Sequence, residues 1–202
     1  MLFRSPDGST VTAFDWVHGA FLHVVLVSPD LTRFEHVHPE VQPDGMWVLT
    51  APDDHEWHVV FESTPTGADA PVIVTAHFAA KDPSSSVPAA DLPALNSTAT
   101  VTAADGTRLV VDLRTTDTGL QFTITTSTGS PAEGLEAYLE QPAHLVVFRV
   151  DDLAYVHLHP TSEIGDPVVT YMGALPADPT YRLFLQFMYR GEVPTVPYTF
   201  AT

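Results

Sequence analysis

The sequence predicts an all-β protein that folds as two tandem β-sandwich domains. Three observations predict this fold class. Short apolar runs are broken by turn-forming residues, a segment rich in Pro and Ser crosses the middle of the chain, and one histidine motif occurs once on each side of that segment. A sandwich is the usual packing for many short strands, because each sheet has an apolar face to bury.

The strand-like runs are rich in Val, Thr, Phe and Tyr, and Gly, Pro or Asp separates them. They lie at residues 21–27, 57–61, 72–78, 109–113, 120–125, 144–150 and 181–187. Helical periodicity is scarce and the chain contains 18 prolines, which disfavour helices. Only residues 132–141 leave open a short helix or an irregular crossing. We therefore expect sandwiches of the immunoglobulin-like or cupredoxin-like kind.

A linker is predicted at residues 81–97, where small and polar residues with several prolines replace the strand pattern. It separates a first domain at residues 1–80 from a second at residues 98–202, and each is long enough to bury a core. The second domain opens with an expected pair of strands at residues 98–114. The first domain has no such pair of strands before its repeat, so we expect it to be smaller or incomplete at its N-terminal side.

An internal repeat relates the two predicted domains. Residues 2–39 align with residues 123–160 without a gap. The alignment pairs Gly8 with Gly129, Asp30 with Asp151, His23 with His144, His36 with His157, His38 with His159 and Pro39 with Pro160. Apolar positions correspond as well, so the sequence indicates a tandem duplication.

Composition excludes several classes of function. The net charge is −17 and Lys81 is the only lysine, whereas nucleic-acid binding needs clustered basic residues. No apolar run is long enough to predict membrane insertion, and residues 1–8 lack the pattern of a signal peptide. The absence of cysteine excludes thiolate catalysis, zinc fingers and blue-copper centres. An acidic surface attracts cations, although an acidic host proteome explains the charge equally well.

Each copy of the motif predicts a β-hairpin with three histidines on one face. If the turns centre on residues 30–31 and 151–152, His23 lies opposite His38 and His144 lies opposite His159. His36 and His157 then lie diagonally on the same face. Opposed Cβ atoms are about 4.5–5.5 Å apart, so the three imidazoles can converge on one ion, each about 2.0–2.1 Å from it. A slip of one residue would separate them.

The candidate metal ligands are therefore His23, His36 and His38 in one half and His144, His157 and His159 in the other. The alternative is that these histidines are hydrogen-bonded core residues, which is the usual role of a lone histidine. We expect the histidine face to be the inner face of each sandwich, since it also carries apolar residues. Three imidazoles there would leave polar atoms unpaired at about 1–3 kcal/mol each, and a cation would satisfy them together.

The other histidines are weaker candidates because none has a counterpart in the second half. His18 is an accessory ligand or an exposed residue, and we expect His55, His58 and His77 to lie outside the site. Asp15 and Glu136 occupy equivalent positions, where a carboxylate could orient a ligating histidine from behind.

The strings at residues 22–27 and 30–39, and those at 144–147 and 152–160, resemble a family of uncharacterised actinobacterial secreted proteins and lipoproteins. The resemblance covers most of both repeats, and its specific element is His-x-His-Pro with a histidine upstream. It implies an extracytoplasmic setting, in the cell envelope or outside the cell, and it implies no particular reaction.

Three functions fit these patterns. The first is a carrier, buffer or sensor of copper or zinc, since imidazole ligands suit both ions. The second is a metalloenzyme with an open three-histidine site for zinc or type 2 copper, acting on superoxide or oxygen. The third is a structural or adhesion module with hydrogen-bonded histidines. Metal ions are the expected partners, and a metal-donating protein or a second copy of the chain is a further candidate.

Overall fold

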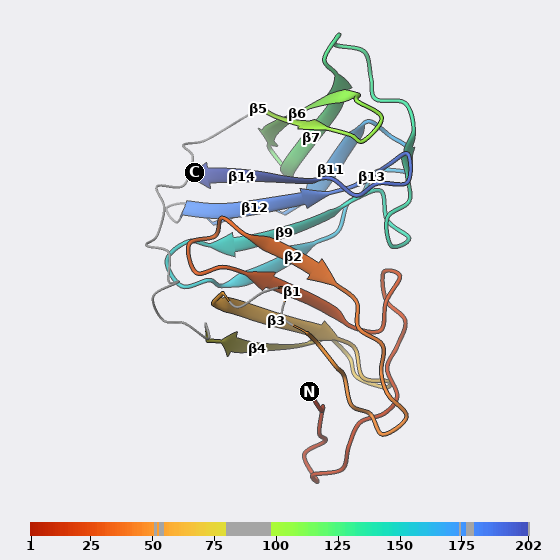
Figure 1. Ribbon diagram of the computed structural model, residues 1–202, viewed down its shortest axis with the longest axis vertical. Helices are drawn as coiled ribbons and strands as arrows, with labels where there is room; N and C mark the ends of the chain where they lie inside the picture. Colours follow the sequence, from red (N-terminus) through yellow and green to blue (C-terminus); the bar gives the residue numbers. More distant parts are fainter. Residues whose placement is uncertain (51, 53–54, 80–97, 174, 177–179, 202) are drawn as a thin grey trace. The chain divides into compact units, whose positions relative to one another are not determined.

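The computed structural model describes residues 1–50, 52, 55–79, 98–173, 175–176 and 180–201. All regular structure in this part of the chain is β-strand, which confirms the predicted all-β class. The chain divides into two compact units, Met1–Leu92 and Pro93–Thr202 (Figure 1). The linker predicted at residues 81–97 lies outside the described residues. Across the described ranges, no helix is long and apolar enough to cross a membrane.

The first unit contains one antiparallel sheet in the order β2-β1-β3-β4 (Figure 1). Its strands are β1 (His23–Val27), β2 (Phe34–Val37), β3 (Trp57–Ser63) and β4 (Val72–Phe78). Loops cover one face of this sheet, and isolated bridges such as Leu2 with Met46 join them. Within its described residues, the first unit therefore has loops where the sequence predicts the second sheet of a sandwich. Among the described residues of this unit, no pair of strands corresponds to that of residues 98–114 in the second unit.

Aromatic side chains from these loops form the core of the first unit. Phe14 packs edge-on against Phe3 and Trp47, with ring centroids 5.4 and 5.1 Å apart. They lie in one cluster with residues of β1 and β3, including Val24 and Val59. Burying several aromatic rings, at 150–250 Å² each, lets this loop layer replace a sheet.

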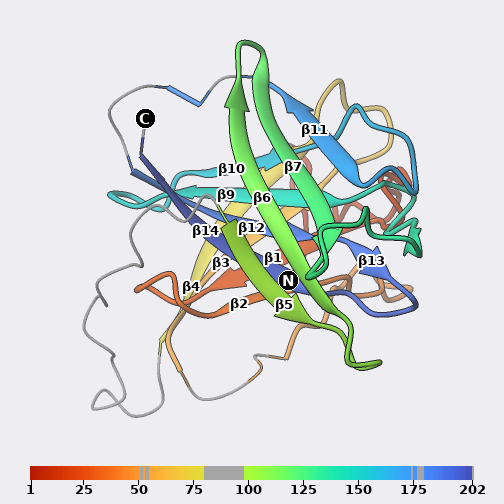
Figure 2. The same cartoon turned by 90° about the horizontal axis from the view of Figure 1, so that it is seen from above.

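The second unit contains two four-stranded sheets, in the orders β10-β9-β12-β14 and β11-β7-β6-β5, together with the short pair β13-β8. Seen from above, the β6 and β7 strands cross over β9 and β10, as in a sandwich (Figure 2). The bounds are β5 (Thr98–Thr102), β6 (Arg108–Thr116), β7 (Gly119–Thr126), β8 (Leu135–Glu136), β9 (His144–Arg149), β10 (Tyr155–Leu158), β11 (Val168–Met172), β12 (Thr180–Gln186), β13 (Met188–Tyr189) and β14 (Thr195–Ala201).

The core of the second unit lies between these two sheets. Phe122 of β7 and Tyr198 of β14 have ring centroids 5.5 Å apart, and the Tyr198 hydroxyl donates to the Val111 carbonyl at 2.9 Å. Burial raises the pKa of Tyr198 far above its ordinary value, with a smaller contribution from Asp112. Residues 132–141 form an irregular crossing that contains β8 and a bridge between Tyr138 and Gln141.

The prediction that the histidine face is the inner face is wrong for both units. The core clusters contain Val24 and Leu26 of β1, and Leu145 and Val147 of β9. Side chains alternate along a strand, so His23 and His144 lie on the opposite face of their sheets. The sequence could not decide this point, because both faces of these central strands carry apolar residues.

Candidate metal centre

The hairpin β1–β2 brings the first three histidines to one end of the sheet. Val25 pairs with His36 and Val24 pairs with Val37, which is the register that the sequence predicts. His23 begins β1 and His38 follows the end of β2, so the same register places them level with each other. Hairpin β9–β10 repeats the arrangement, with His157 paired to Val146.

Three ring nitrogens of the first unit form a nearly equilateral triangle. His23 Nδ1 lies 3.2 Å from His36 Nε2, and His38 Nε2 lies 3.1 Å from each of them. On its other side, the His23 ring places Nε2 3.1 Å from the carbonyl oxygen of Val17. A carbonyl can only accept, so His23 carries its proton on Nε2 and directs the lone pair of Nδ1 into the triangle.

Three neutral imidazole nitrogens cannot all satisfy one another at these distances. Each is either a donor or an acceptor, so at least one of the three pairs joins two atoms of the same kind. That pair is repulsive at hydrogen-bond distance. A cation removes the conflict, because all three nitrogens can then be acceptors that point at it.

The triangle also fixes where an ion would lie. An ion about 2.0–2.1 Å from each nitrogen would sit about 1 Å out of their plane, with nitrogen–metal–nitrogen angles of about 100°. That angle lies between those of a tetrahedral site and of one face of an octahedral site. The three histidines would therefore cap the ion from one side and leave its opposite side open for a further ligand.

The loop at residues 16–21 holds the first ligand in place. Val17 and Ala20 bridge each other, and the turn between them has positive φ angles at His18 and Gly19, 49° and 75°. The turn directs the Val17 carbonyl at His23. The sequence did not predict this contact, because every residue has a backbone carbonyl and the residue type does not show which one accepts a hydrogen bond. The equivalent Tyr138 carbonyl lies 3.1 Å from His144 Nε2.

The proposed orienting role of Asp15 is wrong. Its carboxylate accepts a hydrogen bond from the Thr66 hydroxyl at 2.8 Å, and its amide donates to the Thr64 carbonyl. Asp15 thus ties the loop to the segment after β3, while the Val17 carbonyl orients the ring. The equivalent Glu136 lies exposed in β8, where it pairs with Met188.

Aspartates fix the turn of each hairpin, and with it the register. Asp30 accepts hydrogen bonds from the hydroxyls of Ser28 and Thr32 and from the Thr32 amide. Burial opposes ionisation of Asp30, but these hydrogen bonds outweigh it and lower the pKa of that carboxyl. Leu31 takes the left-handed conformation, with φ 57°.

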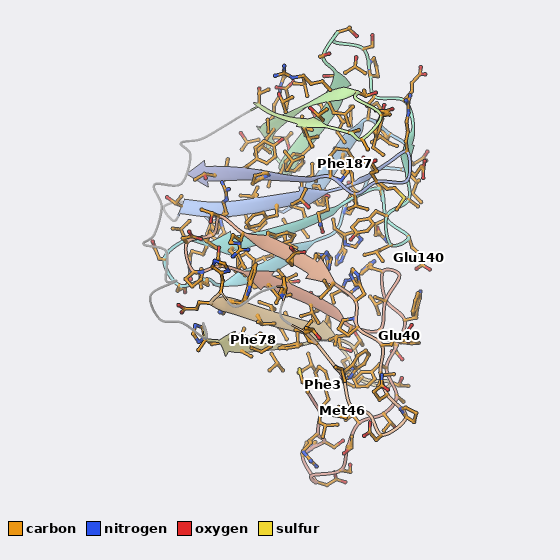
Figure 3. All side chains as sticks on the ribbon, viewed as in Figure 1. Phe3, Glu40, Met46, Phe78, Glu140 and Phe187 are labelled. Atoms are coloured by element: carbon orange, nitrogen blue, oxygen red, sulfur yellow. The ribbon has the colours of Figure 1, made fainter. Side chains whose placement is uncertain are left out.

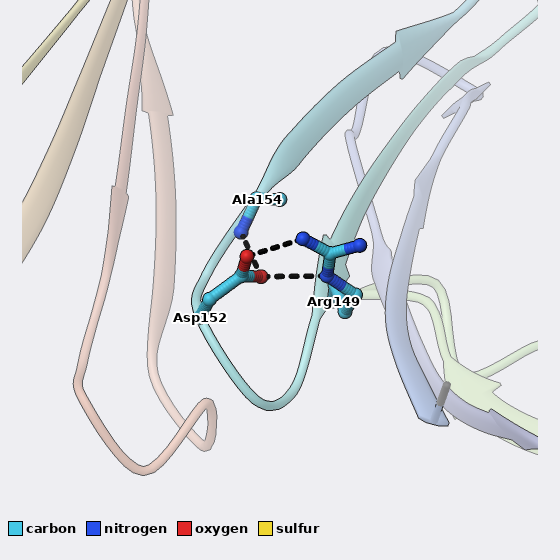
Figure 4. A network of polar contacts seen from close by, with 3 residues as sticks. All are labelled: Arg149, Asp152 and Ala154. Carbon is cyan, nitrogen blue, oxygen red and sulfur yellow. Dashed lines mark hydrogen bonds and ion pairs between the residues drawn. The ribbon is translucent and has the colours of Figure 1, made fainter. Parts of the chain in front are cut away.

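Asp152 has the corresponding role in the second unit, with different partners. It pairs with Arg149 and accepts from the Ala154 amide (Figure 4). The hydrogen bond from Arg149, followed by that from Ala154, lowers the pKa of Asp152 to about 2. Different side chains thus hold the same register in the two hairpins.

The second triad is less tightly gathered than the first. His144 Nδ1 lies 3.1 Å from His157 Nε2, as in the first unit. The His144 and His159 ring centroids are 6.4 Å apart, whereas those of His23 and His38 are 4.9 Å apart. Over the described ranges, the one group of three possible metal ligands within 4.8 Å of one another is His23, His36 and His38.

Two further histidines, His58 and His77, lie on neighbouring strands of the first unit. His58 and His77 are cross-strand neighbours on β3 and β4, and His77 Nε2 lies 2.6 Å from Glu56 Oε1. Burial, with a smaller effect of His77, lowers the pKa of His58. His77 therefore has a partner of its own, Glu56, and lies away from the end of the β1–β2 hairpin that carries the triad.

Fold and site together define an all-β protein with a three-histidine group that could hold a metal ion. Residues 98–202 match the family described as a domain of unknown function, DUF8832, and the chain belongs to this family. The matched range contains strands β5 to β14. Comparison with the curated proteins gives no match.

Proposed function

We propose that this protein binds a transition-metal ion at His23, His36 and His38 and acts as a carrier, buffer or sensor of copper or zinc. The observation that carries the proposal is the triangle of three ring nitrogens 3.1–3.2 Å apart. No assignment of protons makes all three contacts favourable, and one bound cation does. The backbone bond to His23 supplies the support from behind that ligating histidines usually have.

Copper(II) and zinc are the ions that the ligands favour. Neutral imidazole suits copper, zinc and nickel, and among divalent ions the raw affinity is highest for copper. The chain has no cysteine, so thiolate ligands are excluded. The net charge of −17 raises the local concentration of cations and so favours their capture.

The second triad is a further proposed site of the same kind. His144 and His157 already hold two nitrogens 3.1 Å apart, and the Tyr138 carbonyl orients the first ring. A bound ion would have to draw His159 inward. Because that movement costs free energy, we expect the second site to bind more weakly than the first.

A metalloenzyme is the alternative, and the open side of the capped ion favours it. A metal with a free position can activate water or bind an oxygen species. Against this, the acidic residues beside the first triad, Glu35 and Glu40, correspond to Val156 and Thr161 beside the second. The duplicated motif thus lacks a carboxylate common to both copies that could serve as general base.

The resemblance of both motifs to secreted proteins and lipoproteins supports a location outside the cytoplasm. A carrier in that setting would receive or deliver its ion through a metal-donating protein or a second copy of the chain. The third alternative is a structural or adhesion module, for which a chelator would change nothing. Metal content separates it from the proposed function.

Equilibrium dialysis against copper(II) or zinc, followed by elemental analysis of the purified chain, tests the proposal. We expect at least one ion per chain at low micromolar free metal, and loss of the tighter site in the double variant His36→Ala/His38→Ala. The matched control is His77→Ala, which removes a histidine of the same unit outside the triad. Less than about half an ion per chain, or equal binding by both variants, would refute the proposal.

A further inference from the structure

A pocket of about 400 Å³ lies against the first triad. It is lined by Trp16, Gly19, Ala20, Phe21, Pro39 and Val41, together with His38 and Glu40. His38 therefore belongs both to the nitrogen triangle and to the pocket wall. Figure 3 shows Glu40 at the end of the sheet where β2 ends, away from Phe78 at the end of β4. The volume is in the range of small-molecule sites.

Two aromatic rings stand exposed in this pocket. Trp16 is 55% exposed and Phe21 is 40% exposed, and they meet edge to face with centroids 4.9 Å apart. Exposed large apolar side chains that gather at a concave place indicate a binding surface. Neither ring belongs to the core cluster of this unit, which is built from other aromatic residues. Both rings are therefore available to contact a ligand in the pocket.

The loop at residues 16–21 contributes to both the pocket and the triad. Trp16 precedes Val17, whose carbonyl accepts from His23, and Phe21 follows the same turn. The Phe21 carbonyl accepts from the Ser63 hydroxyl at 2.6 Å, which ties this end of the loop to β3. The loop that orients the first ligand thus also presents both aromatic walls.

The second unit has no aromatic walls at the corresponding positions. Ala137 and Pro142 stand where the first unit has Trp16 and Phe21, and Thr161 stands in place of Glu40. The backbone of the two turns is the same, since Tyr138 bridges Gln141 as Val17 bridges Ala20. The turn thus presents its carbonyl to the first histidine without rings at the positions of Trp16 and Phe21, although in the second unit the Tyr138 ring itself lies edge-on to His144, with centroids 5.2 Å apart.

We propose that this pocket binds a small, flat ring that carries a nitrogen donor, and that the donor completes the coordination of the metal beside His38. The proposal rests on the metal site proposed above. The ring would lie against Trp16 and Phe21, in the offset or edge-to-face contacts that aromatic groups favour. The ligand is neutral or cationic, because Glu40 in the wall and the net charge of −17 oppose an anion.

Cobalt(II) makes the test direct, since its visible spectrum reports each change of ligand. The full chain carries His157→Ala, so that only the first site is observed. It is loaded with cobalt and titrated with imidazole and with 4-phenylimidazole. We expect Trp16→Ala and Phe21→Ala each to weaken 4-phenylimidazole about tenfold, and to weaken imidazole less, because its smaller ring covers less of the two aromatic walls. The control is Val48→Ala, which removes an exposed apolar residue of the same unit outside the pocket.

The outcomes separate this inference from the metal site itself. If a further His36→Ala substitution leaves the cobalt spectrum unchanged, the metal site is refuted and this ligand with it. If cobalt binds but Trp16→Ala weakens the binding of 4-phenylimidazole no more than Val48→Ala does, only the aromatic pocket is refuted. Benzoate and acetate form a further arm, in which tighter binding of benzoate than of 4-phenylimidazole would refute the stated preference for neutral or cationic rings.

Discussion

The thermal stability of the first unit should depend on metal through His36. The perturbation is His36→Ala, measured with saturating zinc and with a chelator. The triangle of nitrogens belongs to the folded hairpin, because its three members come from the two strand ends that the register of β1 and β2 brings together. An ion held there stabilises only the folded state, so the free energy of unfolding rises with its concentration.

The size of the effect follows from mass action. At a free zinc concentration about one hundred times the dissociation constant, the stabilisation is about 2.7 kcal/mol. The first unit spans Met1–Leu92. For a unit of that size, 1 kcal/mol shifts the melting temperature by roughly 4–8 °C, so zinc should raise it by about 10–20 °C. His36→Ala opens the triangle and should remove nearly all of this shift.

Differential scanning calorimetry is the assay, because two compact units that unfold independently give separate transitions. The matched control is His77→Ala, whose side chain contacts Glu56 and lies outside the triad. We expect the control to keep the zinc-dependent shift. Equal shifts in the two variants, or a melting temperature in the parent chain that does not respond to the chelator, would show that the triad holds no ion.

Two further predictions concern the fold. The pKa of Asp152 is lowered to about 2, so its ion pair with Arg149 adds stability above the ordinary pKa of 3.8 and loses it as the pH falls to about 2. In urea denaturation, Asp152→Asn should flatten that loss, and an unchanged pH profile would contradict the role of the pair. Gly119→Ala would place a Cβ 2.0 Å from the Tyr171 carbonyl oxygen, whereas at Gly129 nothing lies within 4 Å. We expect Gly119→Ala to cost about 2 kcal/mol or more and Gly129→Ala about 1 kcal/mol, and equal costs would refute the steric argument.

The sequence predicted the hairpins well because the signals that determine them are local. Alternation of side chains and the turn residues around Asp30 and Asp151 fix the register, and the register alone brings His23 close to His36 and His38. These contacts need no knowledge of the rest of the fold.

Features that depend on distant packing could not be predicted. Both faces of β1 are apolar, so the sequence could not show that Val24 and Leu26 face the core. The contact between His23 and the Val17 carbonyl could not be predicted either, because a backbone carbonyl is present at every residue. The pocket wall joins Trp16 and Phe21 to Glu40. The predicted register brings Phe21 level with Glu40, but the turn that adds Trp16 to this wall is not indicated by the strand pattern.

The two triads differ because of what the chain does after the second strand of each hairpin. In the second unit Pro160, the residue next to His159, bridges Tyr171 of β11. In the first unit the corresponding bridge comes later, between Val41 and Trp47. Beside this anchor, the His159 ring lies farther from His144, with centroids 6.4 Å apart.

His38 has two more residues before its anchor, so its ring can turn toward His23, to a centroid distance of 4.9 Å. The same freedom places Pro39 and Glu40 in the pocket wall. The later bridge of the first unit thus accompanies both the closed nitrogen triangle and the pocket beside it. This coupling favours the first unit as the place where an ion is bound and exchanged, because a closed triangle gives affinity and an adjoining pocket gives access.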